Sequence, residues 1–138
     1  MASEYSAFGA PSLLFILIHT VEFHTMKKVL MVCMANICRS PMAQAVAQGL
    51  VAQRGLAQAF EFDSAGTHAP RQGVRPDPRA RSTLLAHGYP PQATRSRRVQ
   101  ALDFLQFDLI VAMDRQNLSD LRRLCPPQQL HKLHMLLS

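Results

Sequence analysis

The sequence predicts an α/β domain in which a parallel sheet carries helices on both faces. Short apolar segments alternate along the chain with segments of helical spacing, as they do in βαβ units. The first apolar segment, 28–32, is continuous, which is typical of a strand buried on both faces. Glycine and proline residues separate the segments and mark their boundaries.

A loop and a helix follow the first predicted strand. Ser40 and Pro41 have the residue types of an N-cap and a first helical position. Apolar residues then recur at helical spacing until Gly55, where we expect the helix to end. Strand, loop and helix thus make the first unit of the fold.

The second unit repeats this pattern. Residues 60–65 are the predicted strand, and a loop rich in glycine and proline covers 66–76. We expect Asp77 to cap the next helix, with Pro78 at its first position and Gly88 beyond its end.

The third unit contains the predicted strand 107–113. A short helical turn with Leu102 and Leu105 precedes it. A helix follows it, with leucines at positions 118, 121 and 124, and the prolines at 126 and 127 end that helix. The last apolar stretch, 130–137, is expected to be a fourth strand.

The 138 residues are a natural size for one domain with a single core. We expect the domain to begin at Met26 and to cover 26–138, with 1–25 as an extension outside the fold. The apolar run 13–18 is too short to cross a membrane, and the residues before it do not resemble a secretory signal. Three cysteines do not make a secreted disulfide framework, so the cytoplasm is the expected compartment.

The formal charge of +6 favours an anionic partner. Seven arginines lie between Arg71 and Arg98, with Asp77 as the single acidic residue among them. No aromatic residues are interleaved with them as a base-stacking surface would require, so a nucleic acid is not the expected partner. An arginine-rich, solvated face is the simpler interpretation.

A pattern of cysteine, five residues, arginine and serine follows the first predicted strand. Its residues are Cys33, Met34, Ala35, Asn36, Ile37, Cys38, Arg39 and Ser40. A loop of this length can direct several backbone N–H groups at one phosphate dianion, and the helix after it adds positive potential. Arg39 can hold two phosphate oxygens in a bidentate fork. The loop is therefore predicted to bind phosphate.

Cys33 is the predicted nucleophile. A thiolate is stabilised at a helix N-terminus near an arginine, and Ser40 can donate a further hydrogen bond to it. Its attack on phosphorus would give a phosphocysteine intermediate that water hydrolyses, while Arg39 and the loop amides stabilise the transition state. If Cys33 were only a packed core residue, the match at Arg39, Ser40 and Pro41 would be coincidence.

Cys38 has two interpretations. It is either a packed residue or a reversible disulfide partner that protects Cys33 from over-oxidation. A metal site would need more than two thiols, and no histidine stands at ligand spacing, so neither a metal nor a cofactor is expected.

From about Met26 onward the chain resembles the low-molecular-weight protein tyrosine phosphatases. The resemblance rests on the loop 33–40 and on later matches at Asp63-Ser64-Ala65-Gly66-Thr67, Pro76-Asp77-Pro78-Arg79-Ala80, Phe107-Asp108, and Met113-Asp114 with Asn117 and Leu121. It implies a Rossmann-like, four-stranded parallel sheet, with Cys33 as nucleophile and Arg39 binding phosphate. It also implies that Asn36, Ser40 and Ser64 form a network that supports the loop. A phosphotyrosine protein or a small aryl phosphate is the implied substrate.

The chain departs from the family in several ways, and one of them is Pro70, the nearest equivalent of an aromatic side chain that the family offers to the substrate ring. Ala35 stands where the family usually has glycine, so the loop must accommodate a methyl group. The family's general acid, an Asp-Pro pair on a loop beyond the fourth strand, and its last helix have no counterpart before Ser138. Asp77-Pro78 matches a different family segment and is expected to cap a helix. The domain is therefore expected to lack its C-terminal part, and the loss of an acid costs about a hundred- to ten-thousandfold in rate.

Two other functions remain open. An arsenate reductase can share this loop and fold, but it relays electrons through additional cysteines, and Cys125 alone remains beyond the loop. A non-catalytic module that binds phosphoproteins without hydrolysing them would be consistent with the missing acid.

Overall fold

The computed structural model describes residues 26–137, and these form the predicted α/β fold. The strands are β1 (Lys27–Cys33), β2 (Phe60–Gly66), β3 (Leu109–Ala112) and β4 (Leu133–Met135). They make one parallel sheet in the order β2-β1-β3-β4. The predicted extension 1–25 lies outside the described residues.

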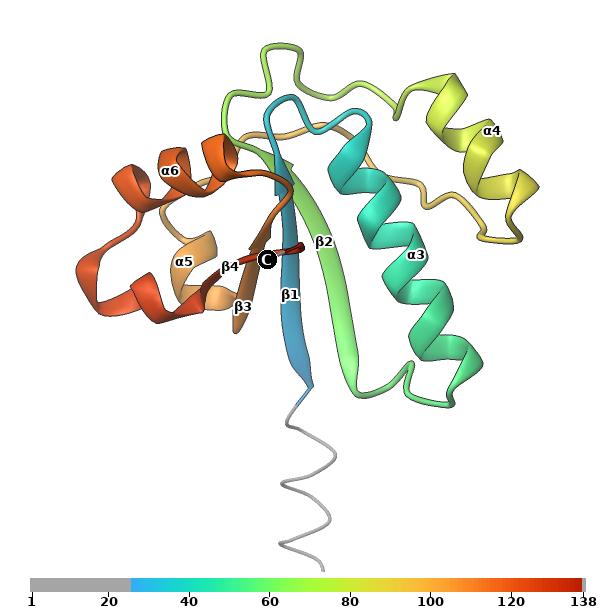
Figure 1. The fold of residues 1–138 in the computed structure, drawn as a ribbon, viewed down its shortest axis with the longest axis horizontal. Helices are drawn as coiled ribbons and strands as arrows, with labels where there is room; N and C mark the ends of the chain where they lie inside the picture. The colour runs from blue at the N-terminus through green and yellow to red at the C-terminus, as the bar shows by residue number, and fades with distance from the viewer. Residues whose placement is uncertain (1–25, 138) are drawn as a thin grey trace, which may run out of the picture.

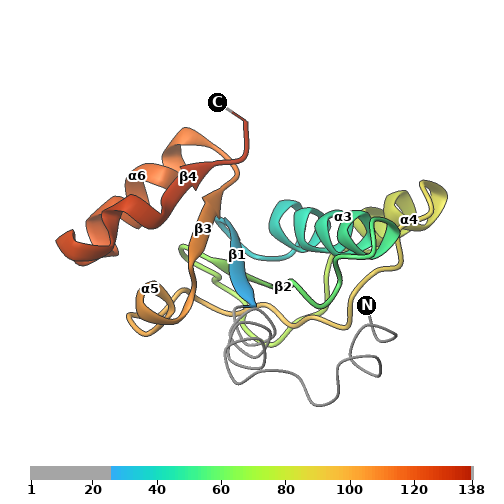
Figure 2. The same cartoon turned by 90° about the horizontal axis from the view of Figure 1, so that it is seen from below.

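Helices cover both faces of this sheet, as predicted. They are α3 (Arg39–Gln53), α4 (Pro78–Ala86), α5 (Asp103–Gln106), α6 (Arg115–Leu124) and the 3₁₀-helix η1 (Pro127–Lys132). Helices α3 and α4 lie on one side, and α5 and α6 lie on the other (Figures 1 and 2). Within residues 26–137, no helix combines the length and apolar character needed to cross a membrane.

Alternate residues of β1 supply two apolar clusters. Leu30 and Val32 are fully buried, and they pack with Phe104 of α5 and Leu121 of α6. The neighbouring β1 side chains face the other way, where Val29 packs in a cluster with residues of α3. Burial on both faces explains why the strand is continuously apolar rather than alternating.

The predicted N-cap of the first helix is wrong. Helix α3 begins at Arg39, and Cys38 occupies the N-cap position without a side-chain hydrogen bond. The Met42 N–H already donates to the Cys38 carbonyl at 3.1 Å, which places Ser40 inside the first turn. Pro41 is tolerated there because the first N–H groups of a helix have no intrahelical acceptor. The Ser40 hydroxyl is used in the phosphate loop instead.

The predicted fourth strand is correct only in its second half. Pro127 opens η1, and the Gln129 N–H donates to the Pro126 carbonyl at 2.9 Å. Only Leu133–Met135 pair with β3. A short apolar run such as 130–137 does not distinguish a strand from a helical turn by its pattern.

The predicted cap of α4 is confirmed. The Asp77 carboxylate accepts the Arg79 N–H at 2.8 Å, and Pro78 is the first helical residue. Gly88 follows the helix with φ of +80°, a backbone angle that glycine adopts without strain.

Candidate active site

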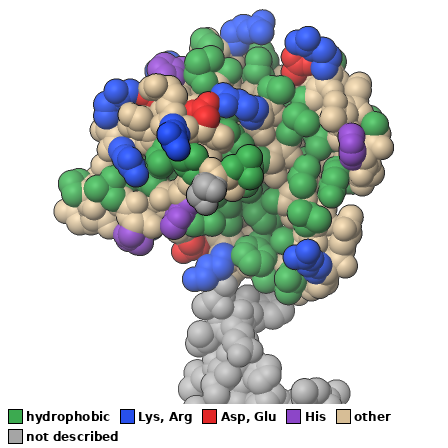
Figure 3. All heavy atoms as spheres, in the orientation of Figure 1, with side chains coloured by type: hydrophobic (Ala, Val, Ile, Leu, Met, Phe, Trp, Pro, Cys, Tyr) green, Lys and Arg blue, Asp and Glu red, His purple; other side chains and the backbone are tan. Residues whose placement is uncertain are grey.

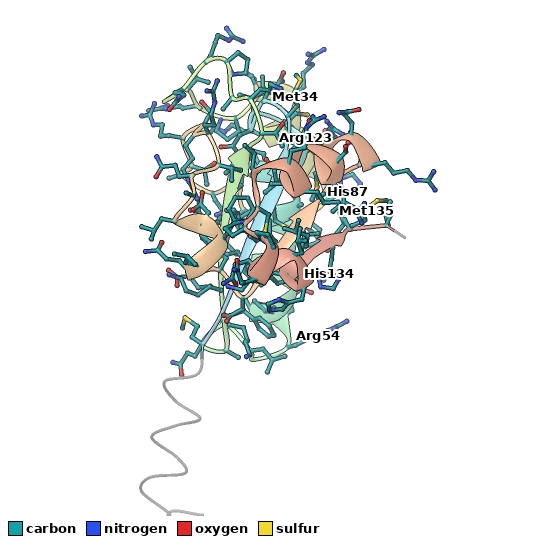
Figure 4. All side chains as sticks on the ribbon, turned by 90° about the vertical axis from the view of Figure 1, so that its left-hand side faces the viewer. Met34, Arg54, His87, Arg123, His134 and Met135 are labelled. Atoms are coloured by element: carbon teal, nitrogen blue, oxygen red, sulfur yellow. The ribbon has the colours of Figure 1, made fainter. Side chains whose placement is uncertain are left out.

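The loop 33–40 lies between β1 and α3 at the carboxyl edge of the sheet, the upper edge in Figure 1. Met34 of this loop and Arg54, which follows α3, lie at opposite ends of the domain (Figure 4). Figure 3 shows Lys and Arg side chains, with some Asp and Glu among them, over the upper part of this face, and further basic side chains at its lower end. In open α/β sheets the carboxyl edge is where ligands bind.

The sulfur of Cys33 lies at the base of the loop. The residue is only 3% exposed. Sγ accepts a hydrogen bond from the Asn36 N–H at 3.3 Å, and it lies 3.0 Å from the Ser40 hydroxyl. The sulfur therefore has two polar groups of the loop within hydrogen-bonding distance.

Asn36 joins the loop to a distant part of the chain. Its side-chain NH₂ group donates to the Ser40 hydroxyl at 2.9 Å, and its side-chain oxygen accepts the Arg97 backbone N–H at 2.9 Å. The residue has φ of +60°, which asparagine tolerates better than most side chains. Asn36 and Ser40 are both almost completely buried, so these bonds determine the shape of the loop.

The loop leaves several backbone donors unused. No hydrogen bond between described residues uses the N–H of Met34, Ala35, Ile37 or Cys38. Ala35 does not need the positive φ that would require glycine, so its methyl group is accommodated. Unused N–H groups in one turn, beside a helix N-terminus, can bind the oxygens of an anion.

The loop carbonyls are bonded by neighbouring segments. The Met34 carbonyl accepts N–H groups from His68 and Ala69, each at 3.0 Å. The Ile37 carbonyl accepts the Asp77 N–H at 2.7 Å. The loop is therefore fixed from outside through its carbonyl groups.

Gly66, at the end of β2, packs directly under the loop. A Cβ atom built there would lie 2.6 Å from the Met34 carbonyl oxygen, so no side chain fits without a backbone shift. The sequence match containing Gly66 gave no reason for a glycine there, and the close approach supplies one.

Arg39, the predicted phosphate ligand, is paired with Asp114. Its Nη1 lies 2.6 Å from an Asp114 carboxylate oxygen. The hydrogen bond from Arg39, together with one from the Asn117 N–H, lowers the pKa of Asp114. The same bond to Asp114 raises the pKa of Arg39, and the neighbouring Cys33 adds to that rise. Arg39 is thus held at the rim of the loop.

Asp114 is a site residue to which the sequence analysis gave no role. It lies two residues after the end of β3 and caps α6, where its carboxylate accepts the Asn117 N–H at 2.7 Å. Since β3 is next to β1, the ends of both strands meet at one edge. The position of Asp114 near the end of a strand that neighbours β1 was the signal that could have identified it. Because its pKa is lowered, Asp114 is ionised at neutral pH and cannot donate a proton there.

Two predicted site residues differ from expectation. Ser64 does not join the loop network, because it pairs with Met31 two positions before the strand end, and its buried hydroxyl has no partner among residues 26–137. Cys38 is an exposed free cysteine, so its interpretation as a packed residue is wrong.

Arg97 is the second site residue that the sequence analysis missed. Its guanidinium contacts the carboxylates of Asp103, at 2.9 and 3.1 Å, and of Asp63, at 3.1 Å. These contacts hold the chain in place at Arg97, whose backbone N–H donates to the Asn36 side chain. Arg97 and Asn36 are 61 residues apart along the chain, so no sequence signal indicated that they are in contact.

Comparison with known proteins agrees with the fold. The family model for low molecular weight phosphotyrosine protein phosphatases matches residues 28–138. Low molecular weight phosphotyrosine protein phosphatase 2 of Drosophila melanogaster is 44% identical over 108 residues, which cover 78% of this chain and 65% of that protein. The human low molecular weight phosphotyrosine protein phosphatase is 42% identical over 97 residues, which cover 70% of this chain and 61% of that protein.

A solved structure gives the same result. A low molecular weight phosphotyrosine phosphatase from Vibrio cholerae superposes with a TM-score of 0.76 at 38% identity, covering 81% of this chain and 71% of that one. The chain spans 61 to 65% of the length of the human and Drosophila relatives. From the family match, the identities and the shared sheet, we conclude that the chain belongs to the low molecular weight phosphotyrosine protein phosphatase family.

Proposed function

We propose that this chain hydrolyses phosphate monoesters, phosphotyrosine or small aryl phosphates, through a phosphocysteine at Cys33. One observation carries the proposal: the Cys33 sulfur lies buried below loop N–H groups that no described residue uses. A phosphoryl group bound by those N–H groups would be next to the sulfur. The membership of the family supports the same substrate class.

The proposed reaction has two displacements at phosphorus. The Cys33 thiolate attacks, the sulfur–phosphorus bond forms, and the bond to the leaving oxygen breaks. Water then attacks the phosphocysteine and releases inorganic phosphate and the thiolate. Loop amides and Arg39 stabilise the charge on the equatorial oxygens, and Ser40 stabilises the thiolate as it leaves.

Arg39 is paired with Asp114 and is also proposed to bind the phosphate. Its ion pair with Asp114 keeps the guanidinium beside the loop, and phosphate binding would add a second anion to the same fork. The ionised Asp114 cannot protonate the leaving oxygen. We therefore expect good leaving groups to react much faster than poor ones.

Cys38, an exposed free cysteine five residues after Cys33, is the proposed reversible disulfide partner. We place the reaction in the cytoplasm, where the reducing environment would keep these thiols active.

The test is turnover of aryl phosphates whose leaving groups differ in acidity, by the full chain and by Cys33→Ser. We expect Cys33→Ser to abolish turnover, because oxygen is a far weaker nucleophile than the thiolate. Cys125→Ser, which changes a cysteine beyond the end of α6, is the control and should retain activity. Activity that survives Cys33→Ser would refute the proposal.

Two outcomes would identify the alternatives. Phosphopeptide binding without a trapped phosphocysteine would indicate a non-catalytic module. Thiol-dependent reduction of arsenate, lost in Cys125→Ser, would indicate an arsenate reductase.

A further inference from the structure

A cavity lined by three arginines lies close to the phosphate loop. It has a volume of about 310 Å³ and is lined by Arg75, Pro76, Arg81, Pro91, Gln92, Ala93, Thr94 and Arg95. Three segments supply the arginines: the loop before α4, the first half of α4, and the stretch that follows it. None of the described residues that line the cavity is aromatic, so they offer no surface on which a nucleic-acid base could stack.

The three arginines have no acidic partner among the described residues. Within residues 26–137, no salt bridge involves Arg75, Arg81 or Arg95. Other arginines of the domain do pair with aspartates, namely Arg39, Arg79, Arg97 and Arg123. The positive charge of the cavity is therefore not neutralised by the described part of the chain.

Hydrogen bonds hold the backbone segments that carry two of these arginines close together. Buried Ser96 accepts the Val74 N–H on its hydroxyl at 3.0 Å and donates its own N–H to the Val74 carbonyl at 2.8 Å. Arg75 follows Val74 and Arg95 precedes Ser96, so each arginine is next to a residue that this pair of hydrogen bonds holds in place. Adjacent like charges repel, and an anion bound between them would remove that cost.

The cavity is also connected to the phosphate loop. Pro76 lines it, and the next residue, Asp77, donates its N–H to the Ile37 carbonyl of the loop at 2.7 Å. A smaller adjoining cavity extends the contact to Pro41 and Met42 at the start of α3. A polypeptide bound at Cys33 would thus have this basic cavity beside its neighbouring residues.

We propose that the cavity formed by Arg75, Arg81 and Arg95 binds an anionic side chain, carboxylate or phosphate, of the substrate polypeptide near its phosphorylated residue. The inference rests on the proposed function, since it assigns an acidic polypeptide as the substrate class of the same loop. Guanidinium forks suit both carboxylate and phosphate groups. Gln92 and Thr94 add neutral hydrogen-bonding groups to the same lining.

Binding to the full chain carrying Cys33→Ser tests this inference, because it requires no turnover. Three phosphotyrosine peptides differ only at flanking positions, which carry glutamate, glutamine or phosphoserine. Fluorescence anisotropy gives the Kd of each. We expect the glutamate peptide to bind about tenfold more tightly than the glutamine peptide. Tighter binding still of the phosphoserine peptide would identify phosphate as the preferred anion.

Arg75→Gln combined with Arg81→Gln should reduce the glutamate-to-glutamine ratio to about one. Arg54→Gln is the matched control, because Arg54 is an exposed arginine at the opposite end of the domain (Figure 4), and it should leave the ratio unchanged. All three arginines are exposed, so urea unfolding should show that the variants remain folded. A ratio that the double variant does not change, or a ratio of one in the parent chain, would overturn the inference.

Unphosphorylated versions of the peptides separate the two proposals. If phosphotyrosine adds nothing to binding, the proposed function fails, while the glutamate-to-glutamine ratio still reports on the cavity. Displacement of the glutamate peptide by a short RNA, lost in the double variant, would assign the cavity to nucleic acid and refute the inference.

Discussion

At Gly66 the absence of one methyl group allows two chain segments to touch. The end of β2 approaches the Met34 carbonyl so closely that a Cβ atom would lie 2.6 Å from its oxygen. The obstacle is backbone, which cannot rotate away. The loop amides that we propose to bind phosphate depend on this approach, because His68 and Ala69 reach the same carbonyl.

Gly66→Ala should therefore destabilise the chain by about 1–3 kcal/mol, the range for overpacked sites, and weaken phosphate binding. Gly49→Ala is the matched control. Its Cβ would meet the Tyr89 ring at 2.7 Å, but a half-buried side chain can shift, and alanine favours the helix by about 1 kcal/mol. Urea unfolding of both variants is the measurement. Equal stabilities would show that the contact below the loop is not tight.

At the scale of elements, Asp114 connects two helices. One carboxylate oxygen caps α6 through Asn117, and the other binds Arg39 at the first position of α3. The start of each helix is thus tied to one side chain, and both helices flank the loop.

This connection predicts an acid-sensitive stability. Arg39 and the Asn117 N–H lower the pKa of Asp114 below its ordinary value of 3.8, so folding favours the carboxylate. The stabilisation is present above the pKa of the unfolded chain, and it is lost as pH falls through the lower pKa of the folded chain. Free energies of unfolding in urea, from about pH 6 to about pH 2.5, measure the effect.

Two variants separate the roles of Asp114. Asp114→Ser retains an N-cap but cannot ionise, so we expect a shallower loss of stability in acid than in the parent chain. Asp114→Ala loses the cap as well and should be less stable than the serine variant by about 1 kcal/mol at neutral pH. Parallel pH profiles for the parent and the serine variant would contradict this role.

The elements differ in how well sequence predicts them. Local signals were sufficient for β1, which is continuously apolar, and for α4, where Asp77 and Pro78 define the start. They were misleading at Ser40, whose residue type suits an N-cap but whose hydroxyl is bonded in the loop to Asn36 and lies beside the Cys33 sulfur. They were also misleading at 130–137, where an apolar run fits a helical turn as well as a strand.

At the scale of the whole molecule, Arg97 ties the phosphate loop to remote elements. Its guanidinium bridges Asp63 of β2 and Asp103 of α5, and its N–H bonds Asn36. Burial alone would lower the pKa of Arg97, but the hydrogen bond and charge of Asp103, with those of Asp63, raise it. The cation is therefore retained despite partial burial.

Arg97→Gln should cost about 2 kcal/mol or more, because Asp103, whose side chain is 8% exposed, would keep a charge without its partner. Arg79→Gln is the exposed control: the Arg79 side chain is 94% exposed, and Asp77 would keep the backbone N–H of residue 79, so this change should cost clearly less. Guanidinium chloride unfolding at neutral pH compares the two. Similar costs would mean that the Arg97 network contributes no more than a surface pair.

The residues of the candidate site also differ in how well the sequence predicts them. Cys33, Asn36 and Ser40 lie within eight consecutive residues, so a local pattern was sufficient to predict that they act together. The positions of Arg97 and Asp114 follow from how the strands pair and from side-chain conformations set by tertiary packing. Chain-wide contacts of this kind leave no local pattern in a single sequence.

The central place of β1 in the sheet has a consequence for motion. The strand pairs with β2 along its whole length and with β3 on its other side, so it has no free edge among the described strands. Amide hydrogens of such a strand exchange with solvent only when the whole domain opens, whereas exposed loops exchange through local fluctuations. The sulfur of Cys33 lies at the end of this strand, and it should therefore keep its position while the segments around it fluctuate.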